Sequence, residues 1–282
     1  MAHPIYLPDG ALERLGELIV MERTLVTSDG KLTPLGVCAY WALASTLVFT
    51  LVYKLSRYYT PLYFKGYKQL TNHEQRDWDT RLGNIIYSAY IVYWAARTLA
   101  LEDTFWAPGP QPMVRRTTPD TFAVLGVSTG FFVHELFITI KYWMGGSAML
   151  LHHVGSLASV LSAIWWAEAH WMTMWMLSTE FTTPFIAFRY MLEKAGFKSH
   201  PLYLINGIAI LASWTVARLA TFPPFFWMVW QHRQEIPLMQ PLTQTLLLVF
   251  PAVLALLNVF WYTKILRGAI KLLGPKRKAK AE

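Results

Sequence analysis

Ionisable side chains inside long apolar stretches are the residues of this sequence best placed to do chemistry. Glu135, His152, Glu180 and Arg218 each fall within such a stretch. A charge near the centre of a bilayer is costly, so an ionisable group in that position is by default a candidate for function. Carboxylates and imidazoles can act as general acids or bases, and Arg218 can pair with a carboxylate.

Helical phase indicates which of these groups share a face. Residues four and seven apart lie on one side of a helix, which places His152 with Ser156 and Glu135 with Thr139, while His153 faces apolar neighbours. Counted at about 1.5 Å per residue, Glu135 and His152 lie at similar depth on neighbouring antiparallel helices. We therefore expect that the two side chains could meet. The contact would be an interhelical hydrogen bond, or the acid–base pair if the protein is an enzyme.

Glu180 is expected near the membrane midplane, with Thr183 on its own face. Pro184 has no N–H to donate to the carbonyl of residue 180, so a kink and a free acceptor are predicted beside the carboxylate. Glu180 is then either protonated or paired with Arg218, and such a pair is either a packing clamp or part of a ligand site. The pattern predicts a polar, lipid-binding cavity lined by Glu135, His152, Glu180, Thr183 and Arg218.

Seven apolar stretches of roughly 18 or more residues must position these groups. The composition favours membrane spans, since 54% of the 282 residues are hydrophobic and only 15% are charged. No stretch shows the alternation of a barrel strand, so the sequence predicts an all-α polytopic bundle around a central cavity. The expected spans are residues 35–58, 83–101, 122–142, 147–167, 170–192, 203–230 and 243–266.

Basic residues gather on one side of the predicted bundle. Residues 54–82, residues 189–202, Lys141 and the segment from Lys264 onward carry about 17 Lys and Arg, against about six on the other side. Cytoplasmic loops accumulate these residues, so this side is assigned to the cytosol. Topology thereby explains the net charge of +8, and we expect no nucleic-acid partner.

The spans divide the chain into four segments. Residues 1–34 are expected to be exocytoplasmic, with a short amphipathic helix at Ala11–Met21 and no signal peptide. Residues 35–73 hold the first span and a basic loop, residues 74–266 the main bundle, and residues 267–282 a basic cytosolic tail.

The tail ends in KAKAE, with Lys280 third and Lys278 fifth from the end. This pattern resembles the dilysine retrieval signal of endoplasmic reticulum membrane proteins, although a polybasic stop that binds anionic headgroups is an equal alternative. The endoplasmic reticulum is the favoured compartment. The mitochondrial inner membrane or another organelle membrane is the alternative.

The sequence contains no pattern for a metal or a cofactor. Adjacent residues on a helix point about 100° apart, so His152 and His153 cannot chelate one ion without distortion. Cys38 is the single cysteine and cannot form an internal disulfide. GxGxxG and Walker motifs are absent from the sequence.

Four segments of the sequence together resemble the TLC-domain family, which includes the ceramide synthases. They are EQRDWDTRLGNIIYSAY with Trp78 and Arg81, GFFVHELFITIKYW, LLHHVGSLAS with His152 and His153, and LSTEFTTPFIAFRYML. The resemblance covers about residues 74–266 and is closest to the small branch outside the ceramide synthases. It implies a bundle of six core spans around a lipid-accessible cavity, plus one extra span.

The sequence departs from the ceramide synthase pattern at its acidic positions. Those enzymes follow the histidine doublet with an HDxSD stretch, whereas no Asp occurs here after Asp120, and Glu135 stands where relatives carry an Asp. Ala187 replaces an Asn that is common in the family. Acyl transfer from a thioester requires a partnered base or nucleophile and a stabilised oxyanion. The resemblance therefore argues against ceramide synthase activity.

Three functions follow from these observations. The favoured one is a non-catalytic lipid-binding or lipid-homeostasis protein whose partners are membrane lipids. The second is a structural accessory subunit of a large organellar membrane complex, with other membrane proteins as partners. The third is a lipid acyltransferase or hydrolase that acts through His152. The identity of the lipid is left open.

Overall fold

The computed structural model describes residues 24–273. Residues 11–21, where the amphipathic helix was predicted, and the basic tail from residue 274 lie outside the described residues. Within the described part of the chain the regular elements are helices, with one isolated β-bridge between Val26 and Leu32. The all-α prediction is confirmed.

Long helices account for most of the described chain, and short 3₁₀ or π segments connect or interrupt them. The α-helices are α2 (Pro34–Tyr63), α3 (Asn72–Leu101), α4 (Asp103–Trp106), α5 (Pro119–Tyr142), α6 (Gly146–Trp166), α7 (His170–Ser178), α8 (Thr183–Lys194), α9 (Pro201–Trp214), α10 (Phe222–Gln231) and α11 (Pro241–Leu273). The shorter segments are η1 (Lys65–Gln69), η2 (Met113–Arg115), η3 (Thr179–Thr182), η4 (Phe197–Ser199), η5 (Thr215–Ala220) and η6 (Ile236–Leu238).

Threonine residues start three of the long helices. Thr33 accepts a hydrogen bond from the backbone N–H of Gly36, and Thr71 and Thr118 each form a capping box at the start of α3 and α5. A side-chain oxygen at this position satisfies an N–H that has no partner inside the helix. The helix starts are therefore specified locally by sequence.

Each predicted span falls within a helical run, but the number of crossings remains a prediction. Five helical runs are long and apolar enough to span a membrane by length and composition: Pro34–Tyr63, Pro119–Tyr142, Gly146–Trp166, Pro201–Gln231 and Pro241–Ile270. The predicted span 83–101 lies in α3, whose first three turns are rich in charge. The predicted span 170–192 is divided between α7 and α8.

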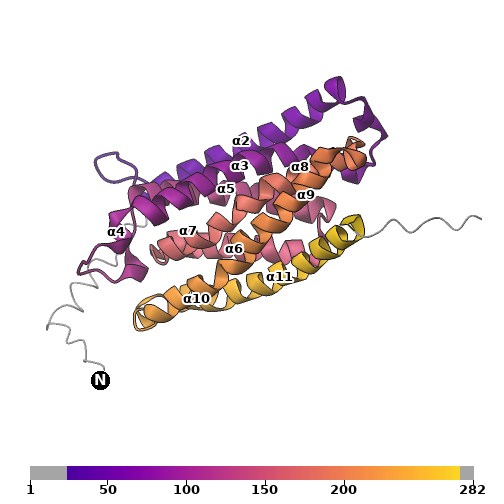
Figure 1. Ribbon diagram of the computed structural model, residues 1–282. Helices are drawn as coiled ribbons and strands as arrows, with labels where there is room; N and C mark the ends of the chain where they lie inside the picture. The colour runs from indigo at the N-terminus through magenta and orange to yellow at the C-terminus, as the bar shows by residue number, and fades with distance from the viewer. Residues whose placement is uncertain (1–23, 274–282) are drawn as a thin grey trace, which may run out of the picture.

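The long helices run side by side and their connections gather at two opposite ends (Figure 1). Across the bundle, α2 packs on α5, α5 on α6 and α6 on α11, while α3 packs on α2, α7 and α8. The α2–α3 connection, the α8–α9 connection and the end of α11 lie at the same end, which we call the basic end (Figure 1). The basic stretches of the described sequence therefore meet in space.

Many large apolar side chains of the described helices face outward. On α2, Leu43 and Leu47 are 64% and 62% exposed, whereas Ser45 and Thr60 are buried. In water such a surface would drive association, but in a bilayer lipid tails cover it. The exposure pattern supports the membrane assignment independently of hydropathy.

Two glycines bring α2 and α5 into backbone contact. A side chain at Gly126 would lie 2.7 Å from the carbonyl oxygen of Cys38, and one at Gly130 would collide with the carbonyl oxygen of Ala42. This GxxxG spacing is typical of membrane helices that pack closely. Ser45 strengthens the contact, because its hydroxyl donates to the carbonyl oxygen of Val127 at 2.7 Å.

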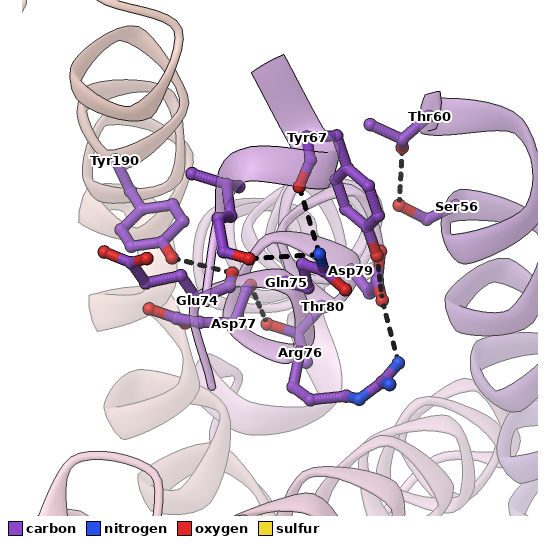
Figure 2. A network of polar contacts seen from close by, with 11 residues as sticks. Ser56, Thr60, Tyr67, Glu74, Gln75, Arg76, Asp77, Asp79, Thr80 and Tyr190 are labelled. Carbon is purple, nitrogen blue, oxygen red and sulfur yellow. Dashed lines mark hydrogen bonds and ion pairs between the residues drawn. The ribbon is translucent and has the colours of Figure 1, made fainter. Parts of the chain in front are cut away.

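A buried polar network fixes the start of α3 against η1 (Figure 2). Asp79 is fully buried and accepts a hydrogen bond from the Tyr67 hydroxyl, at 3.0 Å to each carboxylate oxygen. Arg76 Nη1 lies 3.6 Å from the same carboxylate, and the Gln75 amide donates to the carbonyl oxygens of Tyr67 and Leu70. This network holds the beginning of α3 in the position from which it reaches the candidate site.

We predict that Tyr67→Phe destabilises the protein by about 1–3 kcal/mol, because the buried Asp79 carboxylate loses its hydroxyl donor. The matched control is Tyr63→Phe, whose ring is 71% exposed and whose hydroxyl contacts Thr60 at 3.2 Å. We expect the control to change stability by no more than about 0.5 kcal/mol. Thermal unfolding of the purified protein in detergent measures both, and equal midpoints would show that the network contributes nothing.

Candidate functional site

Two interruptions of helical geometry bring the polar centre together. The run from His170 to Lys194 changes from α7 to the 3₁₀ segment η3 and then to α8, so α-helical geometry is interrupted just before Pro184. The predicted free acceptor beside Pro184 is wrong, because the carbonyl oxygen of Glu180 accepts a hydrogen bond from the backbone N–H of Thr183. The run from Pro201 to Gln231 contains the π-helical segment η5, which carries Arg218. Both breaks change the direction in which side chains point, because 3₁₀ and π geometry have a different number of residues per turn from the α-helix.

Glu180 and Arg218 form a buried ion pair between these two breaks. Arg218 Nη2 lies 3.1 Å from Glu180 Oε1, and each residue is less than 9% exposed. Thr183 donates to Glu180 Oε2 at 2.5 Å, and Arg218 Nε donates to the Thr182 hydroxyl at 2.7 Å. Of the two alternatives that the sequence left open for Glu180, the structure shows the pairing with Arg218. Thr182 is a further partner that helical phase did not suggest.

An aromatic platform supports the guanidinium from the α9 side. The Cζ atom of Arg218 lies 5.1 Å from the ring centre of Trp214, a cation–π distance. The indole N–H of Trp214 donates to the carbonyl oxygen of Asn258 at 3.2 Å, so the platform is tied to α11. The ion pair thus links η3, η5 and, through Trp214, the last helix.

A cavity of about 670 Å³ lies inside the bundle beside this ion pair. Its wall is formed by residues of α3, α5, α6, η3, α8, α9, η5 and α11. The structure brings together all the predicted site residues on this wall: Glu135, His152, Glu180, Thr183 and Arg218. Their use in lipid binding remains a prediction.

The two imidazoles face the cavity without a partner of their own. His152 and His153 both line it, and in the described part of the chain the Nδ1 atoms of both rings are buried without a hydrogen-bond partner. The ring of His152 lies 5.3 Å from that of His153 and 5.9 Å from that of Trp261. Helical phase placed His153 among apolar neighbours, and its ring does lie near Phe132, but it reaches the cavity as well.

Glu135 contacts α3 rather than α6. With its amide oriented to suit its neighbours, Asn84 donates to Glu135 Oε1 and to the carbonyl oxygen of Thr80, each at 3.2 Å. Among the described residues no hydrogen bond joins Glu135 to His152, although both side chains line the same cavity. The expected hydrogen bond between these two groups is therefore absent, and Asn84 on α3 is the partner that the structure gives to Glu135.

A second, smaller hollow of about 70 Å³ adjoins the cavity between α6, α7 and α11. The two share Phe132, His152 and Glu180 as wall residues. The rest of the smaller wall is largely apolar, with side chains such as Leu177 and Leu254. The polar cavity is thus adjoined by a smaller, largely apolar hollow.

Charged residues at the basic end surround the opening of the cavity. Arg81 forms an ion pair with Asp77 and lies over the ring of Tyr190, with Cζ 4.5 Å from its centre. The Tyr190 hydroxyl donates to the carbonyl oxygen of Glu74 at 2.8 Å (Figure 2). Lys194 pairs with the Glu74 carboxylate at 2.5 Å, and this ammonium group with Thr71 lowers the pKa of Glu74 to about 2. The Glu74 carboxylate that links α3 to α8 therefore stays charged at neutral pH.

Several wall residues were missed by sequence reasoning. Helical phase contains a signal for those on α8, since Thr183, Ile186, Tyr190 and Glu193 recur at intervals of three or four residues. Others had been assigned only to topology or to loops, because they lie at the ends of spans. The missed polar wall residues are His73, Asp77, Thr80, Asn84, Arg189, Tyr190, Glu193 and Lys264.

The fold and the site define an integral membrane protein whose helical bundle encloses a polar cavity. A family model described as the TLC domain matches residues 77–267, which is more than half of the chain. The chain belongs to the TLC domain family. The family resemblance seen in the sequence is confirmed.

The relatives fall in the branch outside the ceramide synthases. Human TLC domain-containing protein 4 is 23% identical over 244 residues, covering 82% of this chain and 89% of that protein. TLC domain-containing protein 4 of Xenopus tropicalis is 26% identical over 76% of this chain and 83% of its own length. Topoisomerase I damage affected protein 4 of Saccharomyces cerevisiae is 26% identical over 64% of this chain and 67% of that protein.

We predict strong coupling between Glu180 and Arg218 in a double-mutant cycle. Glu180→Gln and Arg218→Met should each cost about 3–5 kcal/mol, because each leaves one buried charge without its partner. The double variant should lose less than the sum of the two single effects, since neither charge remains. Reversible unfolding in mixed micelles measures the cycle. Additive losses would show that the two side chains do not act as a pair.

Proposed function

We propose that this protein binds a membrane lipid in the cavity and acts without catalysis. The observation that carries the proposal is the pair of imidazoles, His152 and His153, which face a cavity of about 670 Å³ with buried Nδ1 atoms that no described residue satisfies. Buried polar groups are normally hydrogen-bonded, so a ligand with hydroxyl, amide or ester groups fits this wall.

The size and polarity of the cavity support an amphipathic ligand. A volume of about 670 Å³ falls in the range of about 300–1,000 Å³ that is usual for small-molecule pockets. The adjoining apolar hollow shares His152 and Glu180 with the cavity and is suited to hydrocarbon. A lipid whose polar part lies near the imidazoles and whose chain lies against apolar side chains matches both.

The carboxylates of the cavity favour binding over acyl transfer. Glu180 is engaged by Arg218 and Thr183, and Glu135 by Asn84. Neither carboxylate is hydrogen-bonded to His152 or His153 in the described residues. A histidine base is usually oriented by a third group, so the arrangement supports a ligand contact better than a base.

We propose the endoplasmic reticulum as the compartment and membrane lipids as the partners. The support is the basic segment that contains Lys278 and Lys280, on the side that the positive-inside count assigns to the cytosol. Replacing both lysines by Ala should shift a fluorescently tagged protein from the endoplasmic reticulum to later compartments. An unchanged distribution would contradict the retrieval signal and favour a polybasic stop.

We predict that the gently purified protein retains lipid at about one molecule per chain, and that His152→Ala lowers this occupancy about 5- to 10-fold, the equivalent of one buried hydrogen bond. Stability of the lipid-free variant should change little, because its ring nitrogen has no protein partner to lose. Native mass spectrometry and quantitative lipid extraction measure the occupancy.

The matched control is His170→Ala, because His170 is a fully buried histidine with partners inside the protein. Its Nδ1 lies 2.8 Å from the Thr121 hydroxyl and its Nε2 lies 3.2 Å from the carbonyl oxygen of Ala163. This variant should lose about 1–3 kcal/mol of stability and keep its lipid per folded molecule. A lipid-free wild-type protein, or thioester hydrolysis that His152→Ala abolishes, would contradict non-catalytic lipid binding.

A further inference from the structure

Two cations at the basic end of the cavity have no carboxylate partner among residues 24–273. The opening is marked by the wall residues that are exposed, namely His73, Gly145, Leu204, Ile208, Lys264 and Gly268. The neighbouring cations are compensated, since Arg81 pairs with Asp77, Lys194 with Glu74, and Lys198 with Glu193 at 2.9 Å. Arg189 and Lys264 line the same opening, and no described carboxylate lies within ion-pair distance of either.

Arg189 is held in place while most of its donors stay available. Its Nη1 donates to the carbonyl oxygen of Tyr203 at 2.9 Å, and its Cζ lies 3.8 Å from the centre of the Tyr203 ring. A guanidinium group has five N–H donors, so this single hydrogen bond leaves four for a ligand. A fork fixed by an aromatic ring is a suitable receptor for a phosphate group.

Gly207 makes room for this guanidinium. A Cβ atom at Gly207 would lie 2.7 Å from Arg189 Nη1, so any side chain there would displace the fork. Both residues line the cavity. The position of the Arg189 guanidinium on the wall therefore depends on the absence of a side chain at Gly207.

Lys264 supplies the second cation from α11. Its Nζ lies 4.2 Å from the ring centre of Phe260, and its side chain is exposed at the opening. An ammonium group is a point charge that binds phosphate oxygens without fixed geometry. Together Arg189 and Lys264 present two uncompensated positive charges from separate helices.

We propose that Arg189 and Lys264 bind the phosphate of an anionic lipid headgroup at the opening of the cavity. This inference rests on the proposed lipid-binding function and specifies the class of lipid. Two uncompensated charges select a headgroup with net negative charge over a zwitterionic one. A free phosphate ion has the same chemistry, so the experiment must distinguish the two sources.

The test uses the full chain in nanodiscs that contain equal amounts of phosphatidylcholine and phosphatidic acid. After solubilisation, native mass spectrometry should find phosphatidic acid enriched about tenfold in the retained lipid. Arg189→Gln with Lys264→Gln should abolish the enrichment while lipid is still retained. The control pair, Arg97→Gln with Arg233→Gln, removes the same charge from the opposite end and should keep the enrichment.

Two single variants keep the test decisive if the double variant fails to fold. Gly207→Ala should reduce the enrichment, because the new methyl group displaces the Arg189 guanidinium, whose atoms are its nearest neighbours among the described residues. Its matched control is Gly83→Ala in α3, where the added carbon lies 3.5 Å from the nearest atom, on Phe49, and does not face the cavity. Lys264→Gln alone should also reduce the enrichment.

The outcomes separate this inference from the proposed function. Retained lipid without any preference for phosphatidic acid would overturn the inference and leave lipid binding intact. No retained lipid of either kind would overturn both. Displacement of phosphatidic acid by an equal concentration of inorganic phosphate would overturn the lipid headgroup as the ligand.

Discussion

The buried ion pair between Glu180 and Arg218 is the constraint on which the interior depends. Two charges removed from water are stable only when they are paired and hydrogen-bonded, and here Thr182 and Thr183 complete the set. The pair can form because the chain abandons α-helical geometry on both sides, at η3 and at η5. The breaks that would weaken a simple packed bundle are the reason that polar groups converge at this depth and leave space beside them.

The residues in the wall around this pair fall into two groups: those with a side-chain partner in an ion pair or hydrogen bond, and those without one among the described residues. Carboxylates are matched to donors from neighbouring helices, as Glu135 is to Asn84 and Glu74 to Lys194. Two imidazoles in the interior and the cations Arg189 and Lys264 also line the cavity, and none of the four has such a match among the described residues. These four groups are the wall residues that we expect a ligand to contact.

Sequence reasoning predicted the centre of the site better than its edge. Glu180 and Arg218 could be placed because a charge inside an apolar stretch is conspicuous, and Pro184 marked the kink. The predicted contact between Glu135 and His152 was wrong. Helical phase shows which residues share a face of one helix, but not which side chain of a neighbouring helix forms the hydrogen bond. Asn84, the actual partner of Glu135, is neutral, so a search for ionisable side chains in apolar stretches does not find it. Arg189 and Lys264 were missed for a related reason, since both had been counted as topology signals.

Gly126 and Gly130 of α5 show how α2 belongs to the bundle. The matched family region begins at residue 77, after α2, which could suggest that α2 is a detachable anchor. Gly126 and Gly130 show otherwise, because the backbone of α2 at Cys38 and Ala42 occupies the space that side chains would take. A chain that contained only the family region would expose a groove along α5 at Gly126 and Gly130. Lipid tails would fill this groove less closely than the backbone of α2 does. Helix α2 is therefore an integral part of the bundle.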